Sequence, residues 1–258
     1  MRIRPAAHLA CGAVVVSLLA AWLVEPSAAA RPVTQESVAA DTCTIPAKYR
    51  GLDLERLPVT DKVVALTFDA GANPDGVDSI LATLRARHIR GTFLLTGAFV
   101  NAFPVRSRQM AEYLIGNHTM THPDLTKLTD SAVRQQVLDA QSAILRVTGQ
   151  DPRRIFRFPF GARDARTIGI VNSLCYVAFR WTVDSLGWQG TSGGMTVQKV
   201  VDRVVSAAQP GEIVLMHVGS NPDDGSTLDA DALPTIITRL RTLGYSFVTF
   251  ARILNPAP

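Results

Sequence analysis

Most of the chain after residue 60 alternates short apolar segments with longer amphipathic ones, and this alternation constrains the fold more than any other feature. The first apolar segment, VVALTFD at 63–69, precedes a helical pattern at 77–88. The later apolar segments are 91–97, 154–158, 175–181, 212–217 and 245–250, and the later helical patterns are 105–115, 129–148, 164–173, 196–208 and 230–243. Strands that alternate with helices form parallel sheets covered by helices. The sequence therefore predicts an α/β fold, either an open doubly wound sheet or a barrel.

The first 30 residues have the layout of a secretory signal peptide. Two arginines precede an apolar segment at 9–24, and small residues follow it up to Ala30. We expect cleavage after Ala30 and a secreted or extracytoplasmic protein. The alternative is an N-terminal membrane anchor, because the apolar segment approaches the roughly 20 residues that span a bilayer.

The remainder is long enough to bury a large core, since 47% of the 258 residues are hydrophobic. Residues 31–58 are polar and rich in turn-forming residues, without a clear period. We therefore divide the chain into a signal peptide (1–30), an N-terminal arm or linker (31–58) and one domain (59–252).

Charge and cysteine content restrict the partners. The 26 basic and 22 acidic residues give a net charge of +4, but the basic residues are scattered, so we expect no nucleic-acid binding. A mildly basic secreted protein is suited to an anionic cell-envelope surface. No feature predicts a stable protein partner. After signal removal Cys43 and Cys175 remain, either as a disulfide that ties the arm to the domain or as separate thiols.

Polar side chains gather at the ends of the predicted strands. They are Asp69, Arg157, Asp184 and His217, with His118 and His122 in the loop after the 105–115 pattern. In barrels and open α/β sheets the carboxyl ends of strands form one rim, where loops present the reacting groups. The sequence therefore predicts a single site that contains these six residues.

The two rim histidines have the spacing of a possible metal site. His118 and His122 are four residues apart, so both imidazoles would point the same way if the segment formed one helical turn. Imidazole suits zinc and similar cations. The spacing alone also fits two unrelated polar loop residues. His88 lies in the charged segment RARHIR and is expected to be solvated.

Five ordered motifs resemble those of the polysaccharide deacetylases, the NodB-homology enzymes of carbohydrate esterase family 4. They are TFDAG (67–71), HTMTH (118–122), RFPFG (157–161), VDSLGW (183–188) and LMH (215–217). The resemblance covers about 59–252. It implies a distorted (β/α) barrel of NodB type and metal-assisted removal of acetyl groups from a glycan, typically at N-acetylglucosamine units.

The resemblance also implies roles for individual residues. Asp69 would be the general base, oriented and kept ionised by Arg157, and His217 the general acid that protonates the leaving amine. His118 and His122 would hold a divalent metal, zinc in our interpretation. The backbone N–H of Phe160 would bind the oxyanion. Trp188 and Leu215 match positions that enclose the acetyl methyl group, although ordinary core packing would also explain them.

Two positions depart from the family's usual pattern, and both lack a carboxylate. Ala70 replaces the second aspartate of TFDDG, a metal ligand in the family. Asn73 and Asp75, in the loop that follows, are the candidates to replace it, and we expect Asp75 to do so because it restores the charge. Gly187 replaces the second aspartate of D-x-x-D-W, and we expect Asp184 to tune His217 in its absence.

Three functions are compatible with these residues. The first is a metal-dependent deacetylase acting on an N-acetylated glycan such as peptidoglycan or a chitin-like oligosaccharide. The second is a catalytically silent carbohydrate-binding barrel with a degenerate metal site, as the two missing carboxylates suggest. The third, a glycoside hydrolase that uses Asp69 and Asp184, leaves Arg157 and the histidines without a role.

Overall fold

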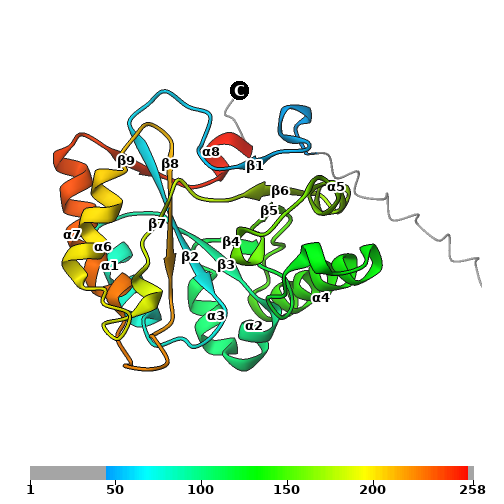
Figure 1. Cartoon of the computed structure of the whole chain (residues 1–258), viewed down its shortest axis with the longest axis horizontal. Coiled ribbons are helices and arrows are strands. Elements are labelled where there is room, and N and C mark those ends of the chain that lie inside the picture. The colour runs from blue at the N-terminus through cyan, green and yellow to red at the C-terminus, as the bar shows by residue number, and fades with distance from the viewer. Residues whose placement is uncertain (1–44, 255–258) are drawn as a thin grey trace, which may run out of the picture. The chain divides into compact units, whose positions relative to one another are not determined.

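The computed structural model describes residues 45–254, and all of them belong to one compact unit, Cys43–Pro258 (Figure 1). The predicted signal peptide and Cys43 lie outside the described residues. Cys175 is disulfide-bonded, which agrees with the expectation of a disulfide, while its pairing with Cys43 stays a prediction. In the described part of the chain no helix is long and apolar enough to cross a membrane.

Within residues 45–254, nine strands form one curled parallel sheet. They are β1 Asp53–Leu54, β2 Val63–Ala70, β3 Thr92–Leu95, β4 Leu114–Asn117, β5 Arg154–Phe156, β6 Tyr176–Phe179, β7 Val183–Asp184, β8 Glu212–His217 and β9 Ser246–Val248. The order is β1-β6-β5-β4-β3-β2-β8-β7, and β9 also pairs with β2. Every pairing between these strands is parallel. The predicted distorted (β/α) barrel is confirmed.

Helices follow most of the strands, as the alternation predicts. The longer ones are α1 Val77–Ala86, α4 Asp130–Thr148, α5 Ala165–Ser173, α6 Val197–Ser206 and α7 Leu228–Thr242. The short ones are α2 Gly97–Ala102, α3 Pro104–Met110 and α8 Ala251–Leu254, with 3₁₀ turns η1 Ala47–Tyr49, η2 Leu125–Lys127, η3 Pro159–Gly161 and η4 Gly187–Gln189. Local chemistry sets the ends of α4: the hydroxyl of Thr129 accepts from the backbone N–H of Ala132, and Gly149 ends the helix with φ 73°.

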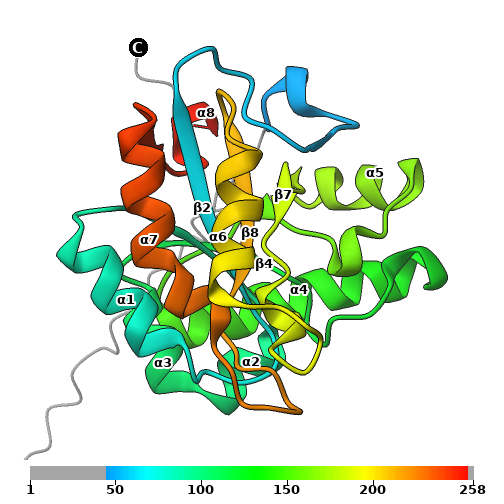
Figure 2. The same ribbon diagram turned by 60° about the vertical axis from the view of Figure 1, so that its left-hand side comes forward.

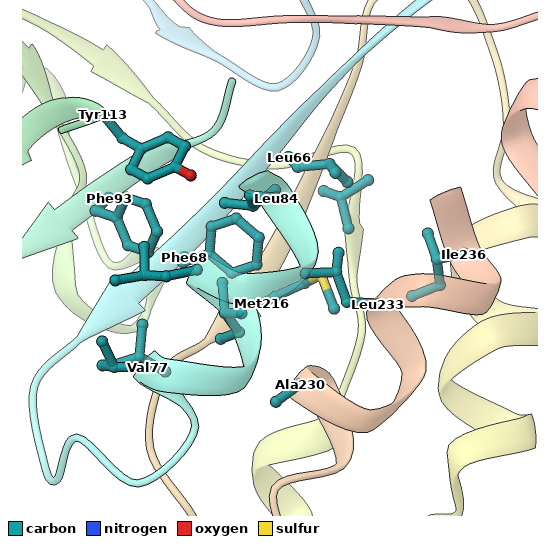
Figure 3. Close-up of a cluster of buried hydrophobic side chains, with 14 of the residues drawn as sticks. Leu66, Phe68, Val77, Leu84, Phe93, Tyr113, Met216, Ala230, Leu233 and Ile236 are labelled. Carbon is teal, nitrogen blue, oxygen red and sulfur yellow. The ribbon is translucent and has the colours of Figure 1, made fainter. Parts of the chain in front are cut away.

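The two faces of β2 explain why Asp69 points into the site. Val64, Leu66 and Phe68 belong to the cluster that packs against α1 and α7 (Figure 3). The alternating residue Ala65 belongs to the cluster that fills the inside of the curled sheet. Because side chains alternate along a strand, Asp69 lies on the same face as Ala65, at the carboxyl end of the strand. Asp69 and His217 are register partners on the neighbouring strands β2 and β8.

The structure corrects three of the expected boundaries. The 105–115 pattern is not one helix, since α3 ends at Met110 and the apolar residues after it form β4. The arm is part of the compact unit from residue 45, because β1 pairs with β6 and Leu57 is buried. Finally, α7 begins at Leu228 rather than at 230, which places Asp229 in its first turn.

Candidate active site

Asp69 is held by a buried arginine. The side chain of Arg157 is inaccessible to solvent, and its Nη1 donates to Asp69 Oδ1 at 2.7 Å. The remaining donors are fixed by the end of β6, because Nε donates to Phe179 O at 3.1 Å and Nη2 to Arg180 O at 2.9 Å. Burial alone would raise the pKa of Asp69, but Arg157, with smaller contributions from His118 and His217, outweighs burial and lowers it. Asp69 is therefore an ionised, oriented carboxylate at neutral pH.

His118 has its tautomer set by the backbone. Its Nδ1 lies 2.8 Å from Arg157 O, so Nδ1–H donates to that carbonyl. Burial lowers the pKa of His118, which favours the neutral ring. In that form Nε2 carries a lone pair, yet it lies 3.3 Å from Asp69 Oδ2. Two acceptors that face each other in a buried site call for a proton or a cation between or beside them.

His122 lies next to His118, but the segment between them does not form the helical turn that the sequence predicts. The segment between them is irregular, and Thr119 and His122 have φ values of 70° and 61°. The backbone N–H of His122 donates to Thr119 Oγ1 at 3.0 Å. The two imidazole rings lie 4.7 Å apart, and His122 also contacts the ring of Phe160. Burial, followed by the proximity of His118, lowers the pKa of His122 to about 4.

The histidine pair fits a cation, but the structure does not add the expected third ligand. Both imidazoles are neutral at pH 7, which is the state that binds metal, and an oxygen of Asp69 lies next to them. Within residues 45–254 no group of three or more His, Cys, Asp or Glu side chains is arranged to hold a metal ion. His118 and His122 are therefore the residues that would hold the cation.

Asp75 is engaged elsewhere. Its Oδ2 accepts from the hydroxyl of Ser220 at 2.6 Å, and the side chain is exposed. Asn73 likewise binds the backbone of Ser220. Its Oδ1 accepts from the Ser220 N–H at 2.8 Å, and its Nδ2 donates to the Ser220 carbonyl oxygen at 3.1 Å. These contacts tie the loop after β2 to the loop after β8. The prediction that Asp75 replaces the missing ligand is not supported. Ala70 is buried in the cluster between the sheet and the helices.

His217 faces a carboxylate that the sequence analysis missed. Asp229, in the first turn of α7, accepts the backbone N–H of His217 on Oδ2 at 2.8 Å, and the same oxygen lies 3.7 Å from His217 Nδ1. Burial would lower the pKa of His217, but Asp229, Asp69 and Asp184 outweigh it and raise that pKa. No sequence motif connects Asp229 with His217. The sequence analysis also expected the helix to begin at 230, after Asp229.

Asp184 contributes to the charge at His217 from farther away. Its Oδ1 accepts from the backbone N–H of Leu186 at 2.9 Å, and its Oδ2 from Trp188 Nε1 at 3.4 Å. These contacts position the turn that carries Trp188. The prediction that Asp184 tunes His217 is thus refined, since Asp229 is the direct neighbour.

These residues line one cavity of about 630 Å³. Asp69, His118 and His122 lie with Phe160 and Trp181 along it, and His217 lies with Asp184, Trp188 and Leu215. Leu215 is buried, whereas Trp188 and Phe160 are 47% and 69% exposed, so ordinary core packing does not explain the two aromatic residues. Phe160 has φ 58°, a conformation that costs a non-glycine residue about 1 kcal/mol, and it lines the cavity. His88, in contrast, is exposed and lies elsewhere, as expected.

The loops that close the cavity come from strands next to each other in the sheet. Figure 2 shows the loop after β8 beside the segment between β7 and α6 at one end of the molecule. Asn221 joins them, since its Nδ2 donates to Trp188 O at 3.0 Å. Both walls of the cavity are therefore anchored to the ends of strands.

Comparisons with known proteins agree with this site. A family model described as polysaccharide deacetylase matches residues 56–179. A peptidoglycan-N-acetylglucosamine deacetylase from Bacillus cereus is 31% identical over 194 residues, which cover 74% of this chain and 68% of that protein. A chitooligosaccharide deacetylase from Rhizobium leguminosarum bv. trifolii is 32% identical over 198 residues, covering 72% of this chain and 89% of that protein.

A solved structure shares the fold. It is a mutant, with restored enzymatic activity, of a CE4-family pseudoenzyme from Bacillus anthracis. It has a TM-score of 0.68 and 28% identity, and the match covers 75% of this chain and 68% of that one. The identity and coverage of the two curated relatives show the family: this chain belongs to the polysaccharide deacetylases.

Proposed function

We propose that the protein is a secreted, metal-dependent hydrolase that removes acetyl groups from an N-acetylated glycan. The observation that carries the proposal is the placement of a buried Asp69–Arg157 pair and of His217 with its carboxylate neighbour around one cavity. A base that is ionised and an acid whose pKa is raised are the two groups that amide hydrolysis requires.

The reaction follows from the positions of these groups. Asp69 takes a proton from the water that attacks the acetyl carbonyl, and Arg157 keeps the carboxylate oriented during that transfer. The carbonyl oxygen gains negative charge, which the backbone N–H of Phe160 stabilises. His217 then gives its proton to the amine nitrogen as the bond from carbon to nitrogen breaks. The products are acetate and a free amino sugar.

A divalent cation, which we propose to be zinc, would be held by His118 and His122 and would polarise the acetyl carbonyl and lower the pKa of water. Trp188 and Leu215 enclose the acetyl methyl group in this proposal, at the part of the cavity next to His217. The names of the relatives support an N-acetylglucosamine polymer, either peptidoglycan or a chitin-like oligosaccharide, as the substrate class. Such a substrate agrees with the predicted signal peptide and a cell-envelope location.

A silent carbohydrate-binding barrel is the second candidate, and Ala70 is the observation that favours it. The similarity to a CE4-family pseudoenzyme supports it too. The retained Asp69, Arg157 and His217 speak against it, because a binding protein needs no buried, charge-paired base.

The test is acetate release from N-acetylglucosamine oligomers by the secreted form, before and after chelation and after zinc is restored. We expect release that chelation stops and zinc restores. Retained glycan binding without acetate release under any of these conditions would favour the silent barrel.

A further inference from the structure

We propose that Asp229 is the positioning residue for His217, and that its carboxylate occupies the space left open by Gly187. The inference rests on the proposed function for its catalytic consequence, but its structural part does not. In the family's motif this carboxylate belongs to the loop after β7, whereas here it belongs to a residue on α7.

The contacts of Asp229 point at His217. The side chain of Asp229 is 3% exposed. Its Oδ2 accepts the backbone N–H of His217 and lies 3.7 Å from Nδ1 of the ring. Both Nδ1 and the other carboxylate oxygen, Oδ1, are buried and lack a hydrogen-bond partner in the described structure. A buried ring nitrogen and a buried carboxylate oxygen without partners are each costly, so a pairing of these adjoining side chains is favoured.

Gly187 provides the space. A Cβ on this residue would lie 2.2 Å from Asp229 Oδ1 and 2.5 Å from Asp229 Cγ. Gly187 is not among the residues with positive φ, so its backbone conformation does not require glycine. The requirement is therefore steric. A side chain at position 187 and the carboxylate of Asp229 exclude each other in this arrangement.

The other charges near His217 are more distant. Asp69 faces it from β2, Asp184 from β7 and His118 from the loop after β4. Among the described residues, Asp229 supplies the carboxylate oxygen that lies within 4 Å of a His217 ring nitrogen. A carboxylate at Nδ1 keeps the proton on that nitrogen and leaves Nε2, on the opposite side of the ring, for the substrate. A first-turn position on α7 is also favourable for negative charge.

The experiment compares four variants of the secreted protein, one of which, Asp229→Gly, is the reference for a double variant. Asp229→Asn keeps the shape and an acceptor for the His217 N–H but removes the charge. Asp231→Asn is the matched control, because it removes an exposed charge from the same helical turn. The double variant Asp229→Gly with Gly187→Asp moves the carboxylate from α7 to the loop. Each is examined by NMR titration of the His217 ring, assigned with His217→Gln, and by the pH dependence of kcat and KM.

For Asp229→Asn we expect kcat to fall about 10- to 100-fold with little change in KM. The pKa of His217 should fall, so the alkaline limb of the rate profile moves to lower pH, because the acid must be protonated. Asp231→Asn should change neither quantity. The double variant should recover the titration of His217 and part of the rate.

An unchanged His217 titration in Asp229→Asn, or one that moves no more than in Asp231→Asn, would overturn the proposal. A double variant no better than Asp229→Gly alone would overturn the exchange of positions. The NMR titration needs no substrate. A wild-type protein that releases no acetate would therefore contradict the proposed function while the role of Asp229 is still tested.

Discussion

Positions 70 and 187 each lack a carboxylate that the family's motifs usually have, and the structure treats them differently. Next to Gly187 the carboxylate of Asp229 fills the space that a side chain would take. The residues expected to replace the carboxylate at position 70, Asp75 and Asn73, are bound to Ser220 instead. In the proposed site Asp229 thus supplies the carboxylate beside His217, while two histidines are left to hold a cation.

The comparison shows that the loss of a motif residue can have different structural consequences at different positions. At position 187 the proposed replacement carboxylate comes from α7, far from the motif in sequence, and it lies next to His217. At position 70 the charge is lost, and a cation there would have fewer ligands and less compensation. Loss of a motif residue therefore has to be judged by what surrounds the position.

The largest expected effect comes from removing the base. Asp69→Asn should lower turnover by about 10²- to 10⁴-fold, because the attacking water then has no proton acceptor. Bound metal should be unchanged, since the histidine pair is intact. Turnover and metal content measured on the same preparation test this, with Asp75→Asn as the exposed control expected to change neither. Loss of metal together with activity would make Asp69 a ligand rather than the base.

A third buried carboxyl group, that of Glu212, differs from those of Asp69 and Asp229, because its oxygens have no hydrogen-bond partner among the described residues. Both oxygens of Glu212, on β8, are buried without a hydrogen bond, and burial raises the pKa of Glu212 to about 8. The fold therefore binds a proton that the unfolded chain loses above its ordinary pKa, so the free energy of unfolding should decrease between about pH 4.5 and pH 8.

Glu212→Gln removes this dependence. We expect it to raise the free energy of unfolding at pH 8 by about 4 kcal/mol and to leave it nearly unchanged at pH 4.5. Urea denaturation at the two pH values measures the effect. Equal stability of the two proteins at pH 8 would show that Glu212 has a partner or water when ionised.

Restoring the carboxylate at position 70 tests the metal side. Ala70 ends β2 in the apolar cluster, so Ala70→Asp tests whether the strand end can turn a carboxylate toward the histidines; if it does, zinc affinity should rise about tenfold or more, which corresponds to about 1.4 kcal/mol. Ala82→Asp adds the same charge at an exposed position of α1, outside the cavity, and serves as the control. Calorimetric zinc titration compares the three proteins, and a thermal melt checks the folding of the Ala70 variant. Equal affinity in Ala70→Asp and wild type would mean that another group already completes the site.

The smallest expected effect is on substrate binding. Trp188→Ala should raise KM about fivefold, or about 1 kcal/mol, and leave kcat nearly unchanged, because the exposed ring contacts the glycan without taking part in proton transfer. A change in kcat with constant KM would instead place Trp188 with the reacting groups, through its contact with His217.

The fold and part of the site follow from sequence patterns. Alternating strands and helices predict the parallel sheet. The strand-end residues Asp69 and His217 do line one cavity, and Arg157 is buried beside Asp69. The sequence analysis did not predict strand β4, because its first residues continue the apolar pattern of 105–115, which is typical of a helix. Asp229 could not be found, because its link to His217 depends on the packing of α7 against β8 and on the missing side chain at Gly187.

Sequence patterns also did not predict the geometry of the histidine pair. A spacing of four residues suggests a helical turn, whereas the structure brings the rings together with two left-handed residues. Left-handed backbone at Thr119 and His122 is rare for such residues, so no propensity predicts it. The loop conformation depends instead on the surrounding strands, since His118 N–H donates to Leu95 O.

We propose that Asp69 is the base and His217 the acid in a site where His118 and His122 would hold a cation, and a zinc titration with turnover measured at each point tests this most directly. The account predicts one zinc per chain and acetate release from N-acetylglucosamine oligomers that rises with the same midpoint, both lost in His122→Ala. Absence of zinc binding and of acetate release across the titration, with the oligomers still bound, would contradict it.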